Sequence, residues 1–407
     1  MRRLTTEEHK QFNEIFENLG ASLDVPESRY DELVSSYQAV GNFLGDDSSP
    51  LAPYKPEIQP QGSFLLGTMI TPVNENDDLD IDLVCELMKK DPSWTAENLK
   101  AKVGDRLKLS ERYKNLLDEE GRRCWTLLYR KNSENAIDKY HMDILPCVNN
   151  ERTRLREQYF NVTVNQVDKL AIRITDRNRP NYKYETDSTK WLKSNPFGYA
   201  KWFEDRCSVL ARRIVLLSEA KVGNVPAYKE KKSPLQRVVQ ILKRHRDMMF
   251  NGDDNKPISI IITTLAAQAY NKETDVLDAL VNVVNNMERY IEHDPRTGLC
   301  IVRNPVNPDE KFTDKWVETP QKQLNFFAWL KQVKQDVEQI TEKRGGLHLI
   351  AESMNKPFGR DVVQRTFSAI ADSQRKSRDN NTLKATATGA LGTIGTAVKA
   401  HTFHGDK

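Results

Sequence analysis

Residues 61–83 read QGSFLLGTMITPVNENDDLDIDL, a Gly-Ser pair followed by aspartates that alternate with apolar residues. In a β-strand, residues two apart point to the same face, so Asp80 and Asp82 project together while the apolar residues between them face a core. Adjacent carboxylates repel each other, and a divalent cation between them relieves that repulsion. The stretch therefore predicts a strand with a Mg²⁺ site on its open face. Taken alone, it also fits a surface strand with a solvated acidic face.

A third aspartate strengthens the metal interpretation. Asp143 lies in YHMDILPCV, residues 140–148, where Met142 and Ile144 flank it with the same alternation. This segment and CWTLLYR, residues 124–130, predict two further strands of the same sheet. A single aspartate in a strand is usually a cap or a salt-bridged surface residue. Three strand-borne carboxylates instead indicate a site for two ions, Mg²⁺ or Mn²⁺.

The Gly-Ser pair supplies a second chemical element. Gly62 lets the backbone turn close to a ligand. Ser63 offers a hydroxyl and an amide at the expected start of a short helix, a place where phosphate oxygens bind. Such a pair is an ordinary turn elsewhere, and it gains weight because the aspartates follow within the same stretch.

Composition limits the class of protein. The chain has 407 residues, of which 38% are hydrophobic and 29% charged, which predicts a substantial core in two lobes. A net charge of +3 excludes a polycation that coats nucleic acid. No stretch approaches the roughly 18 apolar residues of a membrane helix, and the start lacks a signal peptide, so we expect a cytoplasmic protein with no membrane partner. The five cysteines are scattered without a CxxC pair, which argues against a disulfide framework and a zinc site.

Periodicity divides the chain. Residues 5–44 predict two helices or one broken near Pro26, and residues 89–118 are helical in pattern. We interpret residues 54–64 as a turn-rich lead-in and residues 152–200 as a polar surface excursion over a cleft. Apolar residues recur at helical spacing from Trp202 onward, and a last short helix follows residues 356–363.

These observations predict three regions. Residues 1–200 form an α+β core that includes the N-terminal helices, residues 201–374 form a mainly helical lobe, and residues 375–407 form a flexible tail. The tail is first basic and then rich in Gly, Ala and Thr, so it buries too little surface to fold alone.

The order of the motifs resembles a known superfamily. QGSFLLGTMITP, DLDIDLV and HMDILP resemble the Gly-Ser, Asp-x-Asp and third-Asp signature of the polymerase-beta-like nucleotidyltransferases. Together with the N-terminal helices and the helical second half, they resemble the bacterial cGAS/DncV-like nucleotidyltransferases, which make cyclic oligonucleotide second messengers in CBASS anti-phage defence. The resemblance implies a mixed sheet with helices, a helical lobe, and an active site in the cleft between them.

The resemblance also implies roles for individual residues. Asp80 and Asp82 would hold both metal ions, and Asp143 would complete the site and help to deprotonate the attacking ribose hydroxyl. The donor NTP would be attacked at its α-phosphorus by a hydroxyl of a second nucleotide, with release of pyrophosphate. A second round would close the ring, and we expect purine substrates and a product such as cyclic GMP-AMP.

Other residues would bind the donor triphosphate. By the resemblance these are Gln61, Gly62 and Ser63, together with Lys243 and Ser259 from the helical lobe. The helix over VVQILKRHRD, residues 238–247, is expected to pack its apolar face inward while its basic residues face out.

The resemblance further implies partners. ATP and GTP are the expected substrates, an effector would respond to the product, and a ubiquitin-transfer-like enzyme would act on the tail. DNA is not an expected partner, because the chain lacks the His/Cys zinc insertion of the vertebrate DNA sensor.

Two other functions remain open. A template-independent transferase acting on RNA or protein is one, because residues 176–191 combine Arg, Lys, Tyr and Trp as an RNA path would. The other is a non-catalytic nucleotide-binding protein, which the three intact aspartates disfavour.

Overall fold

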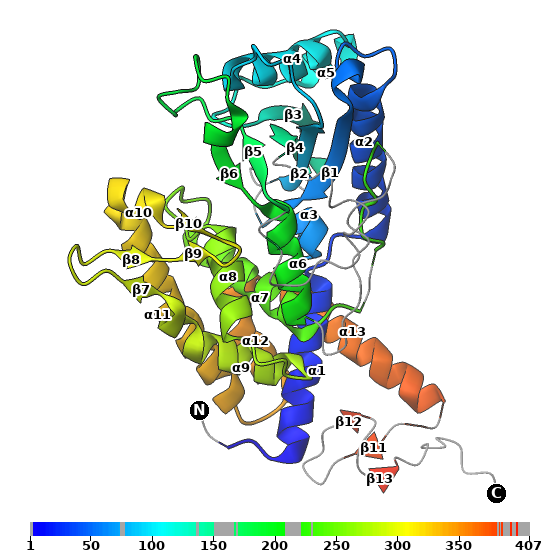
Figure 1. Cartoon of the computed structure of the whole chain (residues 1–407). Helices are drawn as coiled ribbons and strands as arrows, with labels where there is room; N and C mark the ends of the chain where they lie inside the picture. Colours follow the sequence, from blue (N-terminus) through cyan, green and yellow to red (C-terminus); the bar gives the residue numbers. More distant parts are fainter. Residues whose placement is uncertain are drawn as a thin grey trace, which may run out of the picture.

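The structure is a computed structural model that describes residues 3–73, 78–135, 138–149, 167, 170–207, 221–228, 231–380, 382, 384–385, 391–392 and 396–397. Two hydrophobic cores organise these residues, one on each face of a central sheet. The sheet and its outer helices lie above a helical lobe in Figure 1. The described part of the chain contains no helix long and apolar enough to cross a membrane.

The central sheet is mixed, as the sequence predicts. Its strand order is β1 (Pro56–Gln61), β2 (Leu79–Leu87), β4 (Tyr140–Asn149), β5 (Ile172–Ile174) and β6 (Leu192–Ser194), and β3 (Trp125–Tyr129) also pairs with β4. The β2 and β4 strands are parallel neighbours, while every other pair in this sheet is antiparallel. The two segments with the predicted aspartates therefore lie side by side.

Two long helices cover one face of the sheet. These are α2 (Glu27–Gly45) and α4 (Ala96–Lys108), which is followed by the short α5 (Glu111–Leu116). Thr95 caps α4 in a reciprocal pair with Asn98, and the helical pattern of residues 89–118 corresponds to α4 and α5. The apolar positions of β2, from Leu79 to Leu87, join this core. The other face of β2 is therefore free to carry the carboxylates.

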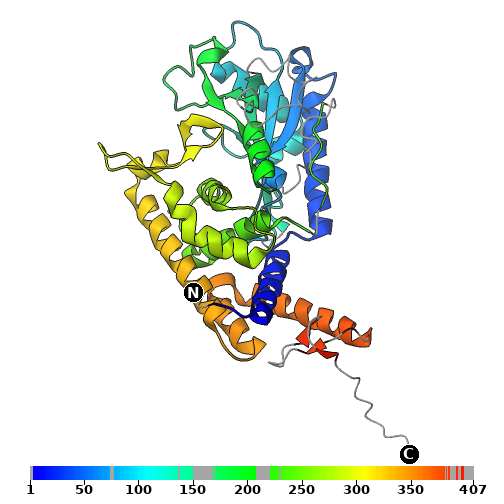
Figure 2. The same ribbon diagram turned by 60° about the horizontal axis from the view of Figure 1, so that its bottom comes forward.

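The helical lobe packs against the opposite face. Its helices are α6 (Pro196–Cys207), α7 (Pro234–Phe250), α8 (Ser259–Ala269), α9 (Val276–Asn286), α10 (Asp314–Glu318), α11 (Pro320–Glu342), α12 (Leu347–Phe358) and α13 (Arg360–Asp379). Val84 of β2 and Leu145 of β4 share a core with this lobe and with the short helix α3 (Gly62–Leu66). Figure 2 shows the end of α13 projecting from the body of the lobe.

The first helix packs with the helical lobe. α1 (Thr6–Ser22) contacts α7, α9 and α13, although the sequence interpretation grouped it with the N-terminal core. Phe12, Phe16 and Leu19 of α1 are buried in the core of that lobe. The chain thus begins in one lobe and crosses to the other at Pro26, where α2 starts.

Several local predictions were wrong. Residues 56–61 form an edge strand, not a turn; its prolines are tolerated because, among the described residues, pairing on the outer side is limited to one bridge, from Ile58 to Val222. Residues 170–200 contain β5, β6 and the start of α6, so they are not a loop excursion. Four short strands, β7 (Glu292–His293), β8 (Cys300–Ile301), β9 (Arg303–Asn304) and β10 (Asn307–Lys311), interrupt the helical lobe.

The C-terminal part also differs from the prediction. The last helix has 20 residues and extends to Asp379, beyond the expected start of the tail. Three two-residue strands follow it, β11 (Lys384–Ala385), β12 (Leu391–Gly392) and β13 (Thr396–Ala397). Residues 208–220, which are part of the segment predicted to be helical from Trp202 onward, and the final segment HTFHGDK lie outside the described residues.

Helix α7 joins the two lobes through its polar side chains. Gln236 donates to the carbonyl oxygen of Leu66 at 2.8 Å, and Gln240 donates to that of Met69 at 2.8 Å. Arg244 donates to the carbonyl oxygen of Thr71 at 2.7 Å. The acceptors lie in the segment between Ser63 and Asp80, so the helical lobe holds the backbone that connects the two motifs.

The basic residues of α7 do not face out, which corrects the sequence interpretation. Lys243, Arg244, His245 and Arg246 are all buried, with exposed fractions of 7%, 3%, 2% and 6%. Burial of so many polar groups is possible because backbone carbonyls and carboxylates accept their hydrogen bonds.

Asp24 is the carboxylate that anchors this junction. It accepts hydrogen bonds from Arg237 and Gln240 at 2.8 Å each, and Lys232 also pairs with it. Arg237 is only 1% exposed, so its charge depends on this partner.

We predict that Asp24→Ala lowers the free energy of unfolding by about 3–5 kcal/mol, because it leaves a buried guanidinium without its carboxylate. Urea denaturation followed by circular dichroism measures this loss. Asp31→Ala, on the exposed side of α2, is the matched control and should change stability by less than about 0.5 kcal/mol. Equal losses in the two variants would contradict the prediction.

Candidate active site

The candidate site is built from two rows of side chains that cross the sheet. In the first row, Gln61 of β1 is in register with Asp82 of β2, which is in register with Asp143 of β4. Thr126 of β3 stands opposite Asp143 and donates a hydrogen bond to its Oδ1 at 2.6 Å. In-register neighbours point to the same face, so the first row puts two carboxylates directly side by side.

The second row lies two residues closer to the start of β2. Asp80 is in register with His141 of β4, and His141 is in register with Leu128 of β3. One oxygen of Asp80, one of Asp143 and a ring nitrogen of His141 all lie within 4.8 Å of one another. The structure therefore brings all three predicted aspartates to one face and adds a histidine that the sequence interpretation did not single out.

The carboxylates crowd one another electrostatically. Burial raises the pKa of Asp82 well above its ordinary value, and the negative charges of Asp80 and Asp143 raise it further. Burial also raises the pKa of Asp143, against the hydrogen bond from Thr126. A cluster that resists ionisation in this way fits a divalent cation, whose charge would reverse the effect.

His141 stands between two carboxylates. Its Nδ1 lies 3.0 Å from Oδ2 of Asp78, and its Nε2 lies 3.1 Å from Oδ1 of Asp80. Burial lowers the pKa of His141, but the two carboxylates outweigh burial and raise it to about 11. The ring is thus held firmly in place at the edge of the acidic cluster.

Gly62 is required by its conformation and by its neighbour. Its φ is +61°, in the left-handed region, and a Cβ placed on it would lie 1.8 Å from Oδ2 of Asp82. Ser63 follows in the first turn of α3. The Gly-Ser turn therefore lies against the carboxylate cluster. The sequence interpretation places the turn and the aspartates in one site.

Lys243 approaches the site from the helical lobe. Its Nζ donates to the carbonyl oxygen of Thr68 at 3.0 Å, and the amide of Thr68 donates to the carbonyl oxygen of Ser63 at 3.1 Å. Burial lowers the pKa of Lys243 to about 8, and nearby Arg246 lowers it too, while Asp80 and Asp82 act to raise it. One residue, Thr68, thus links Lys243 to the turn of Ser63 through hydrogen bonds. The charges of Asp80 and Asp82 also act on Lys243.

Ser259 is held by a different basic residue. Arg246, one turn beyond Lys243 on α7, donates to Oγ of Ser259 at 2.8 Å and to the carbonyl oxygen of Pro257 at 3.1 Å. Ser259 is the first residue of α8. Its proposed contact with a triphosphate therefore remains a prediction, while its link to α7 is a direct contact.

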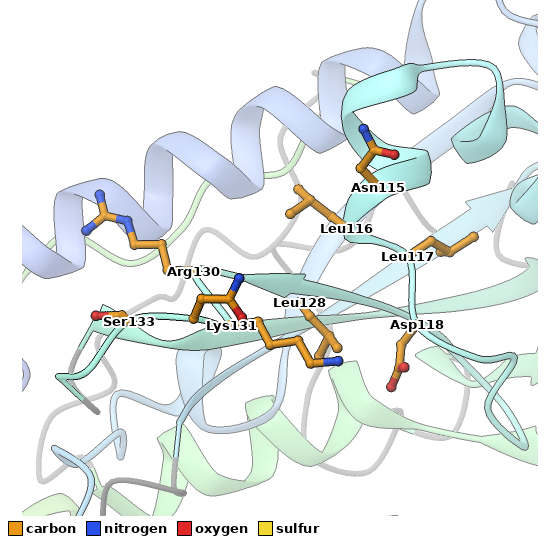
Figure 3. A pocket seen from close by; sticks show the side chains of 9 residues that line it. Asn115, Leu116, Leu117, Asp118, Leu128, Arg130, Lys131 and Ser133 are labelled. Atoms are coloured by element: carbon orange, nitrogen blue, oxygen red, sulfur yellow. The ribbon is translucent and has the colours of Figure 1, made fainter.

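A polar hollow lies next to the second row. It has a volume of about 400 Å³, and the side chains that line it come from α5, β3 and the turns that follow them (Figure 3). Leu128, opposite His141, is one of its walls. Figure 3 shows Leu128, Lys131 and Asp118 on the same side of the ribbon. The hollow is thus separated from His141 by the spacing between the neighbouring strands β4 and β3, which is about 5 Å.

This arrangement defines the class of protein. A mixed sheet with aspartates on adjacent parallel strands, touched by a Gly-Ser turn, is the catalytic core of the polymerase-beta-like nucleotidyltransferases. A family model described as "Second Messenger Oligonucleotide or Dinucleotide Synthetase domain" matches residues 10–169. The matched range contains every residue of the two rows.

Related proteins and solved structures indicate the same class of protein. A c-di-GMP synthase of Roseivirga ehrenbergii is 28% identical over 99% of this chain and 100% of its own length. The structure of CdnG from Bradyrhizobium diazoefficiens in complex with GTP has a TM-score of 0.64, with 21% identity over 89% of this chain and 99% of that one. Vibrio cholerae DncV with a linear intermediate has a TM-score of 0.51, with 13% identity over 89% of this chain and 93% of that one.

By these matches the chain is an enzyme, a nucleotidyltransferase, and it is similar along nearly its whole length to the bacterial cGAS/DncV-like nucleotidyltransferases. The α+β fold expected from the sequence is confirmed.

We predict that Gly62→Ala lowers nucleotide turnover at least about 100-fold, because the new methyl group displaces Asp82 from its position. It should also reduce stability by about 2–4 kcal/mol, as left-handed strain and overpacking add. Steady-state kinetics and urea denaturation measure the two effects.

Gly252→Ala is the matched control. Gly252 also has a positive φ, +90°, but a Cβ there has no heavy atom within 4 Å. It carries backbone strain without the clash, so turnover should stay near that of the unmodified enzyme. If the two variants lost turnover equally, contact with Asp82 would not be the cause.

Proposed function

We propose that the protein joins two molecules of GTP into cyclic di-GMP and releases two molecules of pyrophosphate, one for each bond formed. Synthesis of a cyclic oligonucleotide follows from the family. The choice of guanine is supported by a relative named c-di-GMP synthase and by a structural neighbour solved with GTP. The observation that carries the chemistry is the register of Asp82 with Asp143, beside Asp80 and against Gly62.

The carboxylates would hold the metal. Asp80, Asp82 and Asp143 together fit two divalent cations, Mg²⁺ or Mn²⁺, which supply positive charge to the reacting phosphate and to the leaving pyrophosphate. The raised pKa values of Asp82 and Asp143 support this assignment, because burial first and neighbouring carboxylates second disfavour their charged forms, and a bound cation would favour those forms.

The side chains of the site divide the remaining tasks. Asp143 accepts a hydrogen bond from Thr126 on Oδ1, which leaves Oδ2 to take the proton of the attacking ribose hydroxyl. Gln61, Gly62 and Ser63 line the turn where the donor triphosphate binds. Lys243 faces this turn from the helical lobe, and it can exchange the carbonyl of Thr68 for a phosphate oxygen. A second attack within the linear product closes the ring.

The proposal extends to the biological setting. The product would activate an effector in anti-phage defence within the cytoplasm, and a ubiquitin-transfer-like enzyme would act on the C-terminal tail. The structural neighbour CdnC of E. coli was solved with a HORMA protein, which shows that a relative of this fold binds a protein partner. The proposal also includes the boundaries of the three regions, after residues 200 and 374. It further includes a contact of Ser259 with the donor triphosphate.

The first test is direct identification of the product. Incubation with the four NTPs and Mg²⁺ or Mn²⁺ should give a phosphatase-resistant species with the mass of cyclic di-GMP; cyclic GMP-AMP, which the sequence suggests, has a different mass. Asp80→Asn combined with Asp82→Asn should reduce the yield more than about 100-fold. Loss of a residue that only hydrogen-bonds to a metal ligand costs about 10- to 100-fold, and these two aspartates are proposed as the ligands themselves.

Asp31→Asn is the matched control, because this aspartate is exposed on α2 and distant in sequence from the site. Its yield should equal that of the unmodified enzyme. Linear tails on added RNA, or nucleotides attached to protein, would replace the proposal with the alternative transferase. A cyclic product that survives the double substitution would refute the assigned site.

The pKa of Lys243 leads to a second prediction. Because this pKa is about 8, the ammonium loses its proton as the pH rises above that value, and kcat/KM for GTP should fall about tenfold per pH unit. Lys243→Arg keeps its charge, so its profile should stay flat from pH 7 to 9.5 even if its absolute rate is lower. A flat profile in the unmodified enzyme would show that Lys243 does not bind the triphosphate as a cation.

A further inference from the structure

His141 has no role in the mechanism above, yet its two ring nitrogens face the acidic cluster. Nε2 lies 3.1 Å from Oδ1 of Asp80, and the ligand atoms of His141, Asp80 and Asp143 lie within 4.8 Å of one another. Nδ1 lies 3.0 Å from Oδ2 of Asp78. The imidazole therefore has a carboxylate behind it and two carboxylates in front of it.

The distances match those around a single metal ion. Two neighbouring ligands of an octahedral ion, each about 2.1 Å from it, are separated by about 3 Å. Nε2 of His141 and Oδ1 of Asp80 already have this separation. An ion could be bound between them without movement of either strand, because β2 and β4 hold the two residues in register.

Asp78 lies where a metal-binding histidine usually has its carboxylate partner. Histidines that bind metals usually donate the other ring N–H to a carboxylate, which fixes the tautomer and the ring orientation. Asp78 occupies this position on Nδ1. With Nδ1 donating to Asp78, loss of the proton on Nε2 leaves the lone pair of Nε2 directed toward Asp80 and Asp143.

We propose that His141 is a nitrogen ligand of the divalent cation, in one set with Asp80 and Asp143, and that Asp78 orients its ring. This inference rests on the metal site of the proposed function and adds a donor of a different element to it. Binding releases the proton of Nε2 to solvent, as it does for any histidine ligand. Because Mg²⁺ takes oxygen ligands, a nitrogen donor makes the site prefer Mn²⁺.

Pulsed electron paramagnetic resonance of Mn²⁺ tests the proposal without any turnover. The full-length protein with one equivalent of Mn²⁺ should show the ¹⁴N modulation of a directly bound imidazole. His141→Gln should abolish this modulation and weaken Mn²⁺ binding at least about tenfold, while Mg²⁺ binding changes less. Asp78→Ala should keep the modulation but weaken Mn²⁺ binding about 10- to 100-fold, as loss of an outer-shell carboxylate does.

The chain provides a matched control. His9 lies 2.9 Å from Asp278 and close to Asp275, a second group of His and Asp in the described residues, far from the sheet. His9→Gln should leave both the modulation and the affinity unchanged. A modulation lost in His9→Gln and kept in His141→Gln would overturn the proposal.

The outcomes separate this inference from the proposed function. An unmodified enzyme that makes a cyclic product with Mg²⁺ but shows no ¹⁴N modulation with Mn²⁺ keeps its function and overturns the role of His141. Thermal unfolding of each variant shows whether it is folded. If His141→Gln does not fold, the spectrum of the unmodified protein still decides, because nitrogen is either bound to Mn²⁺ or not.

Discussion

The hydrogen bonds from α7 to residues 66–71 are the constraint on which the rest of the structure depends. This segment directly follows the Gly-Ser turn and α3, so the bonds fix the helical lobe in position relative to that turn. Three side chains on one face of α7, those of Gln236, Gln240 and Arg244, hold this segment. They donate to the carbonyl oxygens of Leu66, Met69 and Thr71 in turn. The bonds to Met69 and Thr71 are buried and the bond to Leu66 is partly buried. A buried carbonyl that lost its donor would carry the full cost of desolvation. The position of the helical lobe is therefore coupled directly to the geometry of the site.

The same helix explains why Lys243 is where it is. It lies in the row of α7 residues that bind the segment and uses the carbonyl of Thr68 as its partner. Asp24 balances the charge of Arg237 at the other end of the row. The helix thus performs a structural task along most of its polar face and places one ammonium group beside the turn that we propose binds the phosphates.

The carboxylate strands could be predicted from the sequence because alternation is a local signal. The aspartates of β2 and β4 stand among apolar neighbours, and that pattern alone determines which face they share. His141 shows the limit of such reasoning, since its importance depends on the parallel register that puts it opposite Asp80. The buried side chains of α7 show the same limit. A run of basic residues on a helix is normally solvated, and only the tertiary structure reveals the carbonyls that bind them. The edge strand β1 was missed because its two prolines are typical of turns, and β5 and β6 because they are only three residues long.

The parallel pairing of β2 and β4 has a consequence for folding. The α4 and α5 helices and the β3 strand lie between these strands in the chain, so the carboxylates meet only after this long crossover has formed. The unfolded chain has no such cluster. By the proposed assignment, a divalent cation would bind the native state alone, and its concentration would add to the stability of the whole enzyme by mass action. The proposed cation would then be a component of the fold as well as of the chemistry.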